Sequence, residues 1–309
     1  MMPVMRKIGY WFVTAVVFLC GCGPHVTLTH TVPAPYNLGL IEKIVLVEAL
    51  GYSDDVREVV SRMADISRYR GFYQFIDARS ARMPLRLLKS TKEEKEAERF
   101  REEWNAGVWA GLEVLDCRIR MLSKAVKEKD DKKNEITVTK YWHEASCEVK
   151  VDLVNASDGR EIASFGVVGT GETDPAASSG PTEAGQARVN ALASAAEQAV
   201  DRFTPRRVSE YVSIDKDAPL GKEGGKLVSD KKLVEARQFW EEALDSHANS
   251  APFLYNLGAV CDALGDTQSA RKYFAEAIRL APDESKYRRA LSALEQREAD
   301  ARELREQRP

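Results

Sequence analysis

The cysteines of this chain are the side chains best suited to covalent or metal chemistry, and Cys20 and Cys22 lie one glycine apart near the amino terminus. Thiols at this spacing can hold a metal ion, form a redox pair or accept a covalent group. A structural metal site needs further ligands close by, and the neighbouring sequence supplies His25 alone. We therefore expect no metal at this pair, and the residues before it indicate a processing signal.

Those residues have the layout of a secretory leader. Arg6 and Lys7 precede an apolar, uncharged run that ends at Leu19, as the charged and apolar regions of export signals do. The run is too short to cross about 30 Å of hydrocarbon comfortably, and no longer apolar run follows it. We expect the chain to be exported without a membrane-spanning helix.

The segment Leu19-Cys20-Gly21-Cys22 resembles the lipobox of bacterial lipoproteins, a Leu-x-small-Cys pattern at the end of the leader. The resemblance implies that residues 1–21 are a signal peptide and that Cys22, once its thiol carries diacylglycerol, starts the mature protein. Acyl chains such as palmitate would then anchor the protein, and more than one chain is needed for stable binding. An ordinary leader with incidental cysteines is the alternative. Gly23 stands where an aspartate often marks inner-membrane retention, which implies the outer membrane, with the protein facing the periplasm.

The composition fits a folded, exported body behind this anchor. The chain has 309 residues, of which 30% are charged and 44% hydrophobic, and a net charge of −3; this length suffices for one or two domains with cores. A nucleic-acid partner is not expected, because it requires a strongly basic face. Residues 22–37 are rich in proline and threonine without sustained periodicity, and they predict a tether.

Residues 38–212 predict an α+β domain. The β-branched run at 41–50 predicts a strand that is buried on both faces. Ser53 begins a helix that Gly71 ends, and Pro181 begins a long helix with an alanine-rich apolar stripe. The other expected elements are a strand at 73–78, a helix from about 90 to 104, a turn at 158–159 and a short helix at 205–212.

Two segments in the middle of this domain, 111–121 and 141–153, alternate like half-buried strands. Leu115, Cys117, Ile119 and Met121 share one face of the first segment, and Cys147 lies on the apolar face of the second. In a hairpin that closes near residue 132, Cys117 and Cys147 lie opposite one another, close enough for a disulfide in some registers. An oxidising periplasm permits that bond. Two free thiols packed as small hydrophobes are the alternative.

This order of elements implies an α+β fold, a mixed sheet with helices packed on one face. The order, and phrases such as VDLVNASDGREIASF at 151–165, resemble the domain shared by the amino-terminal part of TolB-like proteins and the curli-secretion-channel lipoproteins. The resemblance covers residues 38–212. Its curli-channel branch implies an alternative role for the protein, as a subunit of an oligomeric outer-membrane secretion pore with 112–154 as its hairpin.

Residues 213–309 predict an all-α region. Residues 251–284 resemble a tetratricopeptide repeat, a pattern of about 34 residues that folds into two antiparallel helices. Cys261 and Leu254 stand where the pattern usually has Tyr and Trp. The residues expected to pack the two helices are Leu254, Leu257, Gly258, Ala270, Phe274, Ala277 and Pro282.

Parts of further repeats flank this one. One repeat length earlier, Ala236, Trp240 and Ala243 predict the second helix of another repeat, whose first helix at 222–230 is degenerate. The charged segment after residue 285 predicts a solvated capping helix. Because about three repeats are usually needed for a stack that is stable alone, we expect these helices to pack against the α+β domain or against another protein.

No arrangement of residues predicts catalysis. The histidines are scattered, at positions 25, 30, 143 and 247, and no nucleophile, phosphate-loop or zinc motif occurs. The charged helices near 93–103 and 295–306 are typical of solvated surfaces. We expect a protein that is not an enzyme and that needs neither a metal nor another cofactor.

The sequence therefore predicts a membrane-anchored adaptor or assembly factor of the cell envelope. Its partners would be the membrane, through the lipid, and a protein or peptide, through the concave face of the repeats. Asn256, Asp262 and Lys272 are the residues expected on that face. The oligomeric state stays open between a monomeric adaptor and a ring.

Overall fold

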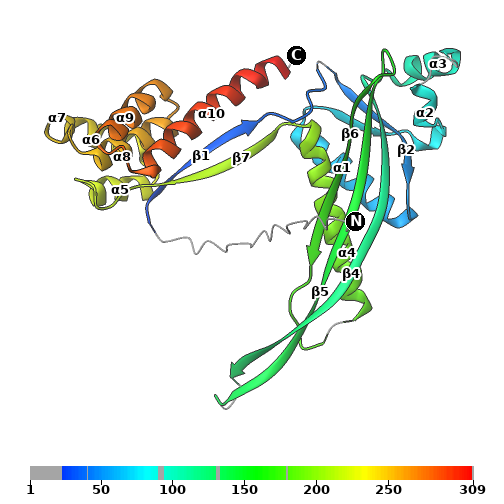
Figure 1. Ribbon diagram of the computed structural model, residues 1–309, viewed down its shortest axis with the longest axis horizontal. Helices are drawn as coiled ribbons and strands as arrows, with labels where there is room; N and C mark the ends of the chain where they lie inside the picture. Colours follow the sequence, from blue (N-terminus) through cyan, green and yellow to red (C-terminus); the bar gives the residue numbers. More distant parts are fainter. Residues whose placement is uncertain (1–22, 40, 90–93, 130–132, 179, 308–309) are drawn as a thin grey trace, which may run out of the picture. The chain divides into compact units, whose positions relative to one another are not determined.

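A computed structural model describes residues 23–39, 41–89, 94–129, 133–178 and 180–307. These residues divide into two compact units, and Figure 1 shows the elements of each. One unit, the repeat unit, combines the described residues up to Thr29 with Ser209–Gln296; the other, the sheet unit, combines His30–Val208 with the residues from Arg297 onward. Residues 1–22, which include the predicted signal peptide and Cys22, lie outside the described residues.

The sheet unit contains a five-stranded mixed sheet in the order β3-β2-β4-β5-β6. Strand β2 (Lys43–Leu50) is parallel to both of its neighbours, β3 (Gln74–Asp77) and β4 (Val108–Lys129). Strands β4, β5 (Glu135–Asn155) and β6 (Glu161–Glu172) are antiparallel. The predicted mixed sheet and its three consecutive antiparallel strands are confirmed.

Helices cover both faces of this sheet at β2. Helices α1 (Ser53–Arg70) and α4 (Pro181–Phe203) lie on one face, and the short α2 (Leu85–Leu88), a 3-10 turn at Arg79–Ala81 and α3 (Glu94–Trp104) lie on the other. The prediction that helices pack on one face is therefore wrong for this part of the sheet. The reason is that β2 is apolar on both sides: Ile44 and Leu46 belong to one buried cluster, and Val45 and Val47 to another.

Local signals set the helix ends as expected. Asp54 and Asp55 occupy the first turn of α1, where carboxylates favour the helix dipole. Gly71 ends the helix in the left-handed region, at φ 69°, and Gly159 has the same φ in the turn after β5. Helix α4 begins at Pro181, and α3 ends at Trp104 as predicted. Residues 90–93, at the start of the helix predicted from about 90 to 104, lie outside the described residues.

Helix α4 approaches β6 closely because both surfaces carry very small residues. Gly169 and Gly171 of β6 face Ala187, Ala191 and Ala195 of α4, and a Cβ atom on either glycine would overlap the helix backbone. Ion pairs then join α4 to α1: Arg188 binds Asp55, and Asp201 accepts from Arg70 at 2.5 Å. The glycine pair thus sets how deeply the helix layer sits on the sheet.

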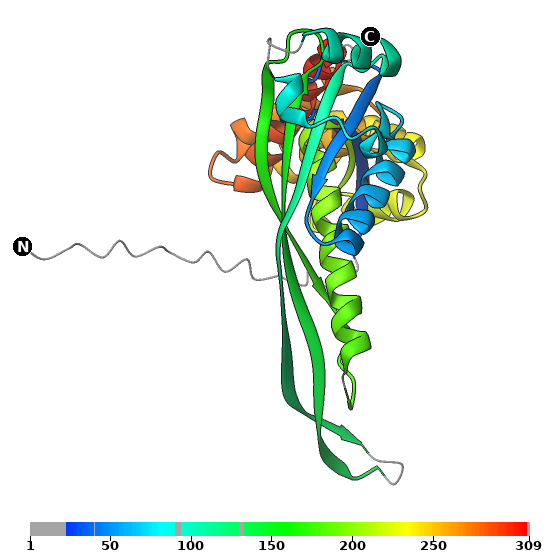
Figure 2. The ribbon, with the colours of Figure 1, turned by 90° about the vertical axis from the view of Figure 1, so that its right-hand side faces the viewer.

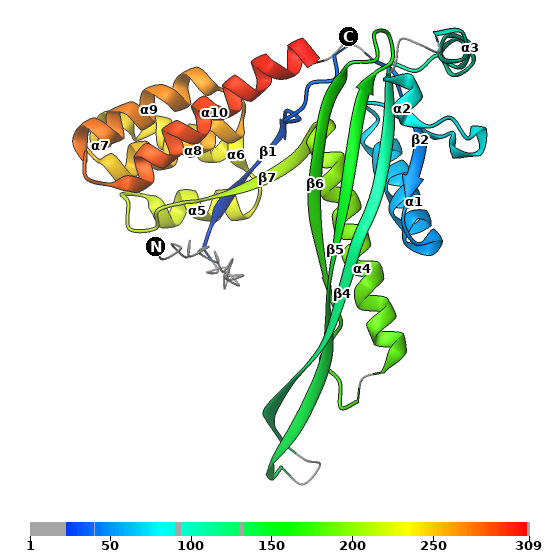
Figure 3. The ribbon, with the colours of Figure 1, turned by 45° about the vertical axis from the view of Figure 1, so that its right-hand side comes forward.

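The β4–β5 hairpin is much longer than the segments predicted for it. Its pairing continues from Val108↔Asn155 to Lys129↔Glu135, whereas β6 pairs with β5 only as far as Glu144↔Glu172. Figures 2 and 3 show the two strands continuing past the end of β6. The part of the hairpin from Leu122↔Trp142 to Lys129↔Glu135, which we call the distal hairpin, lies beyond the β5–β6 ladder.

A β-bulge in β4 changes which side chains share a face. The register slips between Val114 and Asp116, so Leu115 is the extra residue and is 48% exposed. The prediction that Leu115 lies on the face of Cys117 is therefore wrong. Cys117 and Ile119 keep the alternation that was predicted beyond that point.

Strand β1 (His25–Val32) pairs with β7 (Arg206–Ser213) in a separate two-stranded sheet. Two predictions are wrong here. Half of the tether expected at 22–37 is the strand β1, and the short helix expected at 205–212 is also a strand. Val26 and Leu28 are buried while their neighbours in β1 are exposed, so β1 has an apolar face that a free tether would leave in water.

The repeat unit is built from helices in sequence order. They are α5 (Gly221–Ser229), α6 (Leu233–Glu242), α7 (Leu244–His247), α8 (Ala251–Ala263), α9 (Thr267–Leu280) and the first part of α10 (Ser285–Gln307). Helix α5 packs on α6, α6 on α8, and α8 on α9. Among the described residues, no helix combines the length and the apolar character that a membrane crossing requires.

Candidate partner-binding site

The α8–α9 hairpin packs as the repeat pattern predicts. Leu254, Leu257, Ala270, Phe274 and Ala277 are all buried in one cluster. A Cβ atom on Gly258 would lie 2.8 Å from the ring of Phe274, so only glycine lets α8 approach α9 this closely. Pro282 is exposed and follows the end of α9, where proline cannot continue the helix.

The same contact recurs one repeat length earlier. A Cβ atom on Gly224 of α5 would overlap the ring of Trp240 on α6, and Trp240 is fully buried. Gly224 and Trp240 therefore correspond to Gly258 and Phe274. The first helix of this earlier repeat, which was predicted to be degenerate, keeps the glycine that its packing requires. The spacing of one repeat length between Gly224 and Gly258 is the sequence signal that could have identified this glycine.

Helix α8, which was expected to present a binding face, is buried almost all round. Residues 213–217, which follow β7 and which we call the connector, contact one side of α8. Oδ1 of Asn256 accepts from the Asp215 amide and its Nδ2 donates to the Asp215 carbonyl, both at 2.8 Å. The Tyr255 hydroxyl donates to the Ser213 carbonyl at 3.2 Å, and Ile214 is buried between these two contacts. The chain's own connector therefore occupies this face as an extended peptide would.

The three residues predicted to contact a partner therefore differ in how exposed they are. Asn256 has an exposed fraction of 0%, so its prediction as a contact for another protein is wrong, and it holds the connector instead. Asp262 is buried at the other end of α8. Lys272 lies exposed on α9, with its Nζ 5.9 Å from the Tyr273 ring centroid. Of the three, only Lys272 presents its side chain to solvent.

A charged and aromatic cluster, which was not predicted from the sequence, surrounds the connector. Nζ of Lys286 lies 4.3 Å from the Tyr255 ring centroid and 3.6 Å from a carboxylate oxygen of Asp215. The Tyr255 and Tyr287 rings are 5.2 Å apart. Burial raises the pKa of the Tyr255 hydroxyl, and the Asp215 carboxylate adds to that shift, so Tyr255 stays neutral and acts as a donor.

The remaining ionisable groups of this helical hairpin have structural roles. Asp266 caps α9 by accepting from the Ser269 amide at 3.1 Å, and this bond lowers the pKa of its carboxyl. Arg237 binds the same carboxylate at 3.0 Å. Burial raises the pKa of the Cys261 thiol to about 11, so it remains protonated at neutral pH and is a poor nucleophile.

Replacing Asn256 with alanine is expected to destabilise the repeat unit by about 2 kcal/mol, because two partly buried backbone groups of Asp215 lose their partners. Hydrogen exchange followed by mass spectrometry should show faster exchange at residues 213–217. Lys272→Ala, at an exposed position of the same hairpin, is the matched control. Unchanged protection of 213–217 in Asn256→Ala would contradict the clamp.

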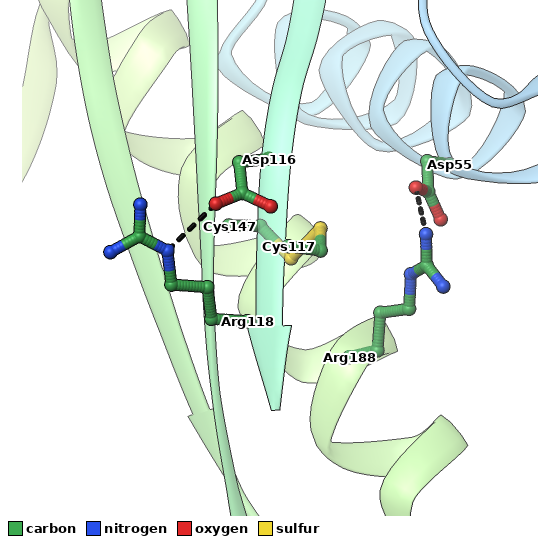
Figure 4. The surroundings of a disulfide bond; sticks show 6 residues. All are labelled: Asp55, Asp116, Cys117, Arg118, Cys147 and Arg188. Atoms are coloured by element: carbon green, nitrogen blue, oxygen red, sulfur yellow. Dashed lines mark hydrogen bonds and ion pairs between the residues drawn. A yellow bond between two sulfur atoms is a disulfide. The ribbon is translucent and has the colours of Figure 1, made fainter. Parts of the chain in front are cut away.

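The two cysteines of the β4–β5 hairpin are register partners. In the structure their sulfurs are bonded and their Cα atoms lie 4.1 Å apart. Figure 4 shows the bond beside Asp116 and Arg118, whose side chains form an ion pair of 2.7 Å, and near the pair of Asp55 with Arg188. Hydrogen bonding to Asp116 raises the pKa of the Arg118 guanidinium. The bond lies where β6 still pairs with β5, because Cys147 is also the register partner of Gly169.

The described residues contain no group of three or more His, Cys, Asp or Glu side chains suited to a metal ion. The two histidines of β1 and His247 are separate from one another, and His143 is buried on β5. Trp104 and Trp109 pack in the core beside Phe100, as expected for structural aromatics.

Comparison with known families agrees with the geometry of the repeat. The tetratricopeptide repeat family matches residues 227–294, which run from the end of α5 into α10. The matched range contains Trp240, Gly258 and Phe274, and Gly224 lies just before it. A search of curated proteins finds no match to the chain.

Several solved structures can be superposed on about half of this chain, with low structural similarity. The PelC dodecamer from Paraburkholderia phytofirmans is 14% identical, with a TM-score of 0.31, and the match covers 58% of this chain and 98% of that one. The lipoprotein GNA1162 from Neisseria meningitidis is 11% identical, with a TM-score of 0.25, and the match covers 47% of this chain and 90% of that one. A minor lipoprotein from Acinetobacter baumannii is 13% identical, with a TM-score of 0.27, and the match covers 55% of this chain and 92% of that one. Likeness at this level carries no argument about function.

Proposed function

We propose that the protein is a lipid-anchored lipoprotein of the cell envelope that holds another protein through its helical repeats and catalyses no reaction. The observation that carries the adaptor role is the tetratricopeptide repeat at 227–294, because such repeats bind polypeptides. The lipobox-like segment ending at Cys22 supports the anchor. By the same resemblance we place the protein at the outer membrane, facing the periplasm.

The anchor has a direct test. Cells fed an alkyne fatty acid should label the wild-type protein, and Cys22→Ala should abolish the label, because the thiol of Cys22 is the acceptor. Cys20→Ala is the matched control, since Cys20 stands in the variable position of the pattern and leaves with the leader; it should label normally. Label that survives in Cys22→Ala would refute the anchor.

The partner surface is proposed on α9 around Lys272, because the connector covers α8. A photocrosslinking amino acid at Lys272 should capture a defined envelope protein in living cells. The same probe at Tyr69 on α1, which is 92% exposed, is the control for random encounters. Identical products from both positions would contradict a partner surface on the repeat.

The length of the β4–β5 hairpin favours one second candidate, a subunit of an oligomeric secretion pore. Strands of about 9–11 residues suffice to cross a membrane, and β4 and β5 have 22 and 21 residues. Size-exclusion chromatography and conductance measurements on the lipidated protein decide between the two. A ring with stable conductance supports the pore, and a silent monomer supports the adaptor.

A further inference from the structure

The sheet unit protects two of its edges against pairing with another chain. Strand β3 has four residues, and an edge this short offers few backbone groups to a partner strand. Along β6, Nδ2 of Asn190 donates to the Glu172 carbonyl at 2.9 Å. Nε2 of Gln198 donates to the Val168 carbonyl at 3.0 Å. Helix α4 thus occupies backbone acceptors of β6 that a partner strand would otherwise use.

Strand β4 has an edge without this protection. Strand β2 pairs with β4 only as far as Leu50↔Glu113, whereas the pairing of β4 with β5 continues to the end of the strand. From Leu115 onward, no second strand among the described residues pairs with β4 on the side opposite β5. A strand directs alternate amide and carbonyl groups to each side, so this side keeps a row of donors and acceptors for a partner. We call residues 115–121 the open segment.

The open segment presents different side chains on the two faces of the sheet. Ile119 lies on the face of α4, because its register partner Ala145 belongs to the buried cluster that α4 completes, and Met121 shares that face. These two side chains are nevertheless 39% and 57% exposed. On the other face, the side chains of Arg118 and Arg120 are 86% and 76% exposed, although each pairs with a carboxylate of this chain. The open segment therefore combines an apolar row with a cationic row.

Neighbouring strands hold the open segment in place. Cys117, in its middle, is bonded to Cys147 of β5 (Figure 4), and Cys147 is also the register partner of Gly169 on β6. A partner strand would consequently meet an edge that is already ordered, which lowers the entropy lost on binding.

A second copy of this chain does not complement the open segment. In a symmetric antiparallel pairing of two open segments, the Arg118 and Arg120 side chains of both copies would share one face, and like charges across a strand pair are destabilising. Strand β6 of a second copy has its edge occupied by Asn190 and Gln198. Charge complementarity favours a different polypeptide, one that carries carboxylates.

From these observations, we propose that the open segment binds an extended segment of another protein as an added strand in line with β2, and that this segment alternates acidic and apolar side chains. Its carboxylates would lie beside Arg118 and Arg120, and its apolar side chains beside Ile119 and Met121. The site belongs to the sheet unit. It is therefore separate from the partner surface proposed on the repeats, and it does not depend on the proposed anchor.

The test measures, by fluorescence anisotropy, how a labelled peptide of about eight residues that alternates glutamate and valine binds the full chain in detergent. The matched peptide has the same composition, with its glutamates in one block and its valines in another. The variant Arg118→Glu/Arg120→Glu reverses the cationic row. The matched control variant is Arg57→Glu/Arg68→Glu on α1. The side chains of Arg57 and Arg68 are 75% and 77% exposed, and each also pairs with a carboxylate.

The alternating peptide should bind the wild-type protein and the control variant equally, and it should slow amide hydrogen exchange at residues 115–121. Its affinity for Arg118→Glu/Arg120→Glu should be about tenfold lower, because carboxylates would then face carboxylates. The block peptide should bind the wild-type protein about tenfold more weakly, because its side chains no longer match both rows.

Three results would overturn the proposal. One is equal binding of the two peptides or by the two variants, and another is unchanged exchange at residues 115–121. The third is a dimer of the full chain that dissociates in Arg118→Glu/Arg120→Glu but persists in the control variant, because a second copy would then occupy the open segment.

Discussion

Gly169→Ala is expected to lower the stability of the sheet unit by about 3 kcal/mol or more, because its new methyl group would overlap the backbone of Ala191 and Ala195. Backbone atoms cannot move aside as a flexible side chain can. Helix α4 would have to rise from the sheet, which opens the cluster that holds Leu192, Val200 and Phe203. The midpoint of thermal unfolding, followed by circular dichroism, should fall by about 10 °C.

Gly166→Ala is the control for this substitution, on the same strand. A Cβ atom there would have the Glu148 carboxylate at 3.8 Å, an ordinary contact. Gly166 is exposed on the opposite face, so alanine should leave stability unchanged or raise it slightly through a smaller loss of backbone entropy. Equal melting of Gly169→Ala and wild type would show that α4 does not pack on β6 as described.

Removal of the Cys117–Cys147 bond is expected to cost about 3 to 4 kcal/mol, the loop-closure value for its sequence separation of 30 residues. The double variant Cys117→Ser/Cys147→Ser should unfold at a lower temperature than the wild-type protein. The wild-type protein in reductant should unfold at the same temperature as the variant. The distal hairpin should lose hydrogen-exchange protection first, because beyond the single bridge of Tyr141 to Ala176 its two strands have no third partner among the described residues, and an isolated pair of strands is marginally stable.

Thiol chemistry supplies the independent check on this prediction. In lipidated, denatured and unreduced protein, an alkylating reagent should modify Cys261 alone, because the other two sulfurs are bonded. The double variant is the matched control and should not respond to reductant. Alkylation of Cys117 and Cys147 without reductant would contradict the bond.

Patterns within single elements predicted most of the sheet unit. The run at β2, the capped helix α1 and the alternation in β4 and β5 are each encoded by neighbouring residues, so they were readable without tertiary information. The pairing of Cys117 with Cys147 was readable for the same reason: hairpin register depends on one turn. The bulge at Leu115 was missed, although it shifts the inward positions of β4 from even numbers up to Val114 to odd numbers from Cys117 onward.

Long-range pairing explains the main errors. Strand β1 is short and interrupted by histidines, and the segment of β7 carries a proline before it and charges within it. Each looks irregular or helical alone, and each is a strand because the other is beside it. The misassignment of Asn256 has the same origin, since its partner Asp215 belongs to a connector whose path no repeat pattern encodes.

The pairing of β1 with β7 also constrains the order in which the molecule folds. All of the sheet unit's strands and α4 lie between these two segments in the sequence, so β1 must wait until β7 has been synthesised. Domains tend to fold from the amino terminus during synthesis, and here the first described residues are among the last to reach their native contacts. Val26, apolar and without its cluster during that interval, is the residue that a chaperone would need to shield.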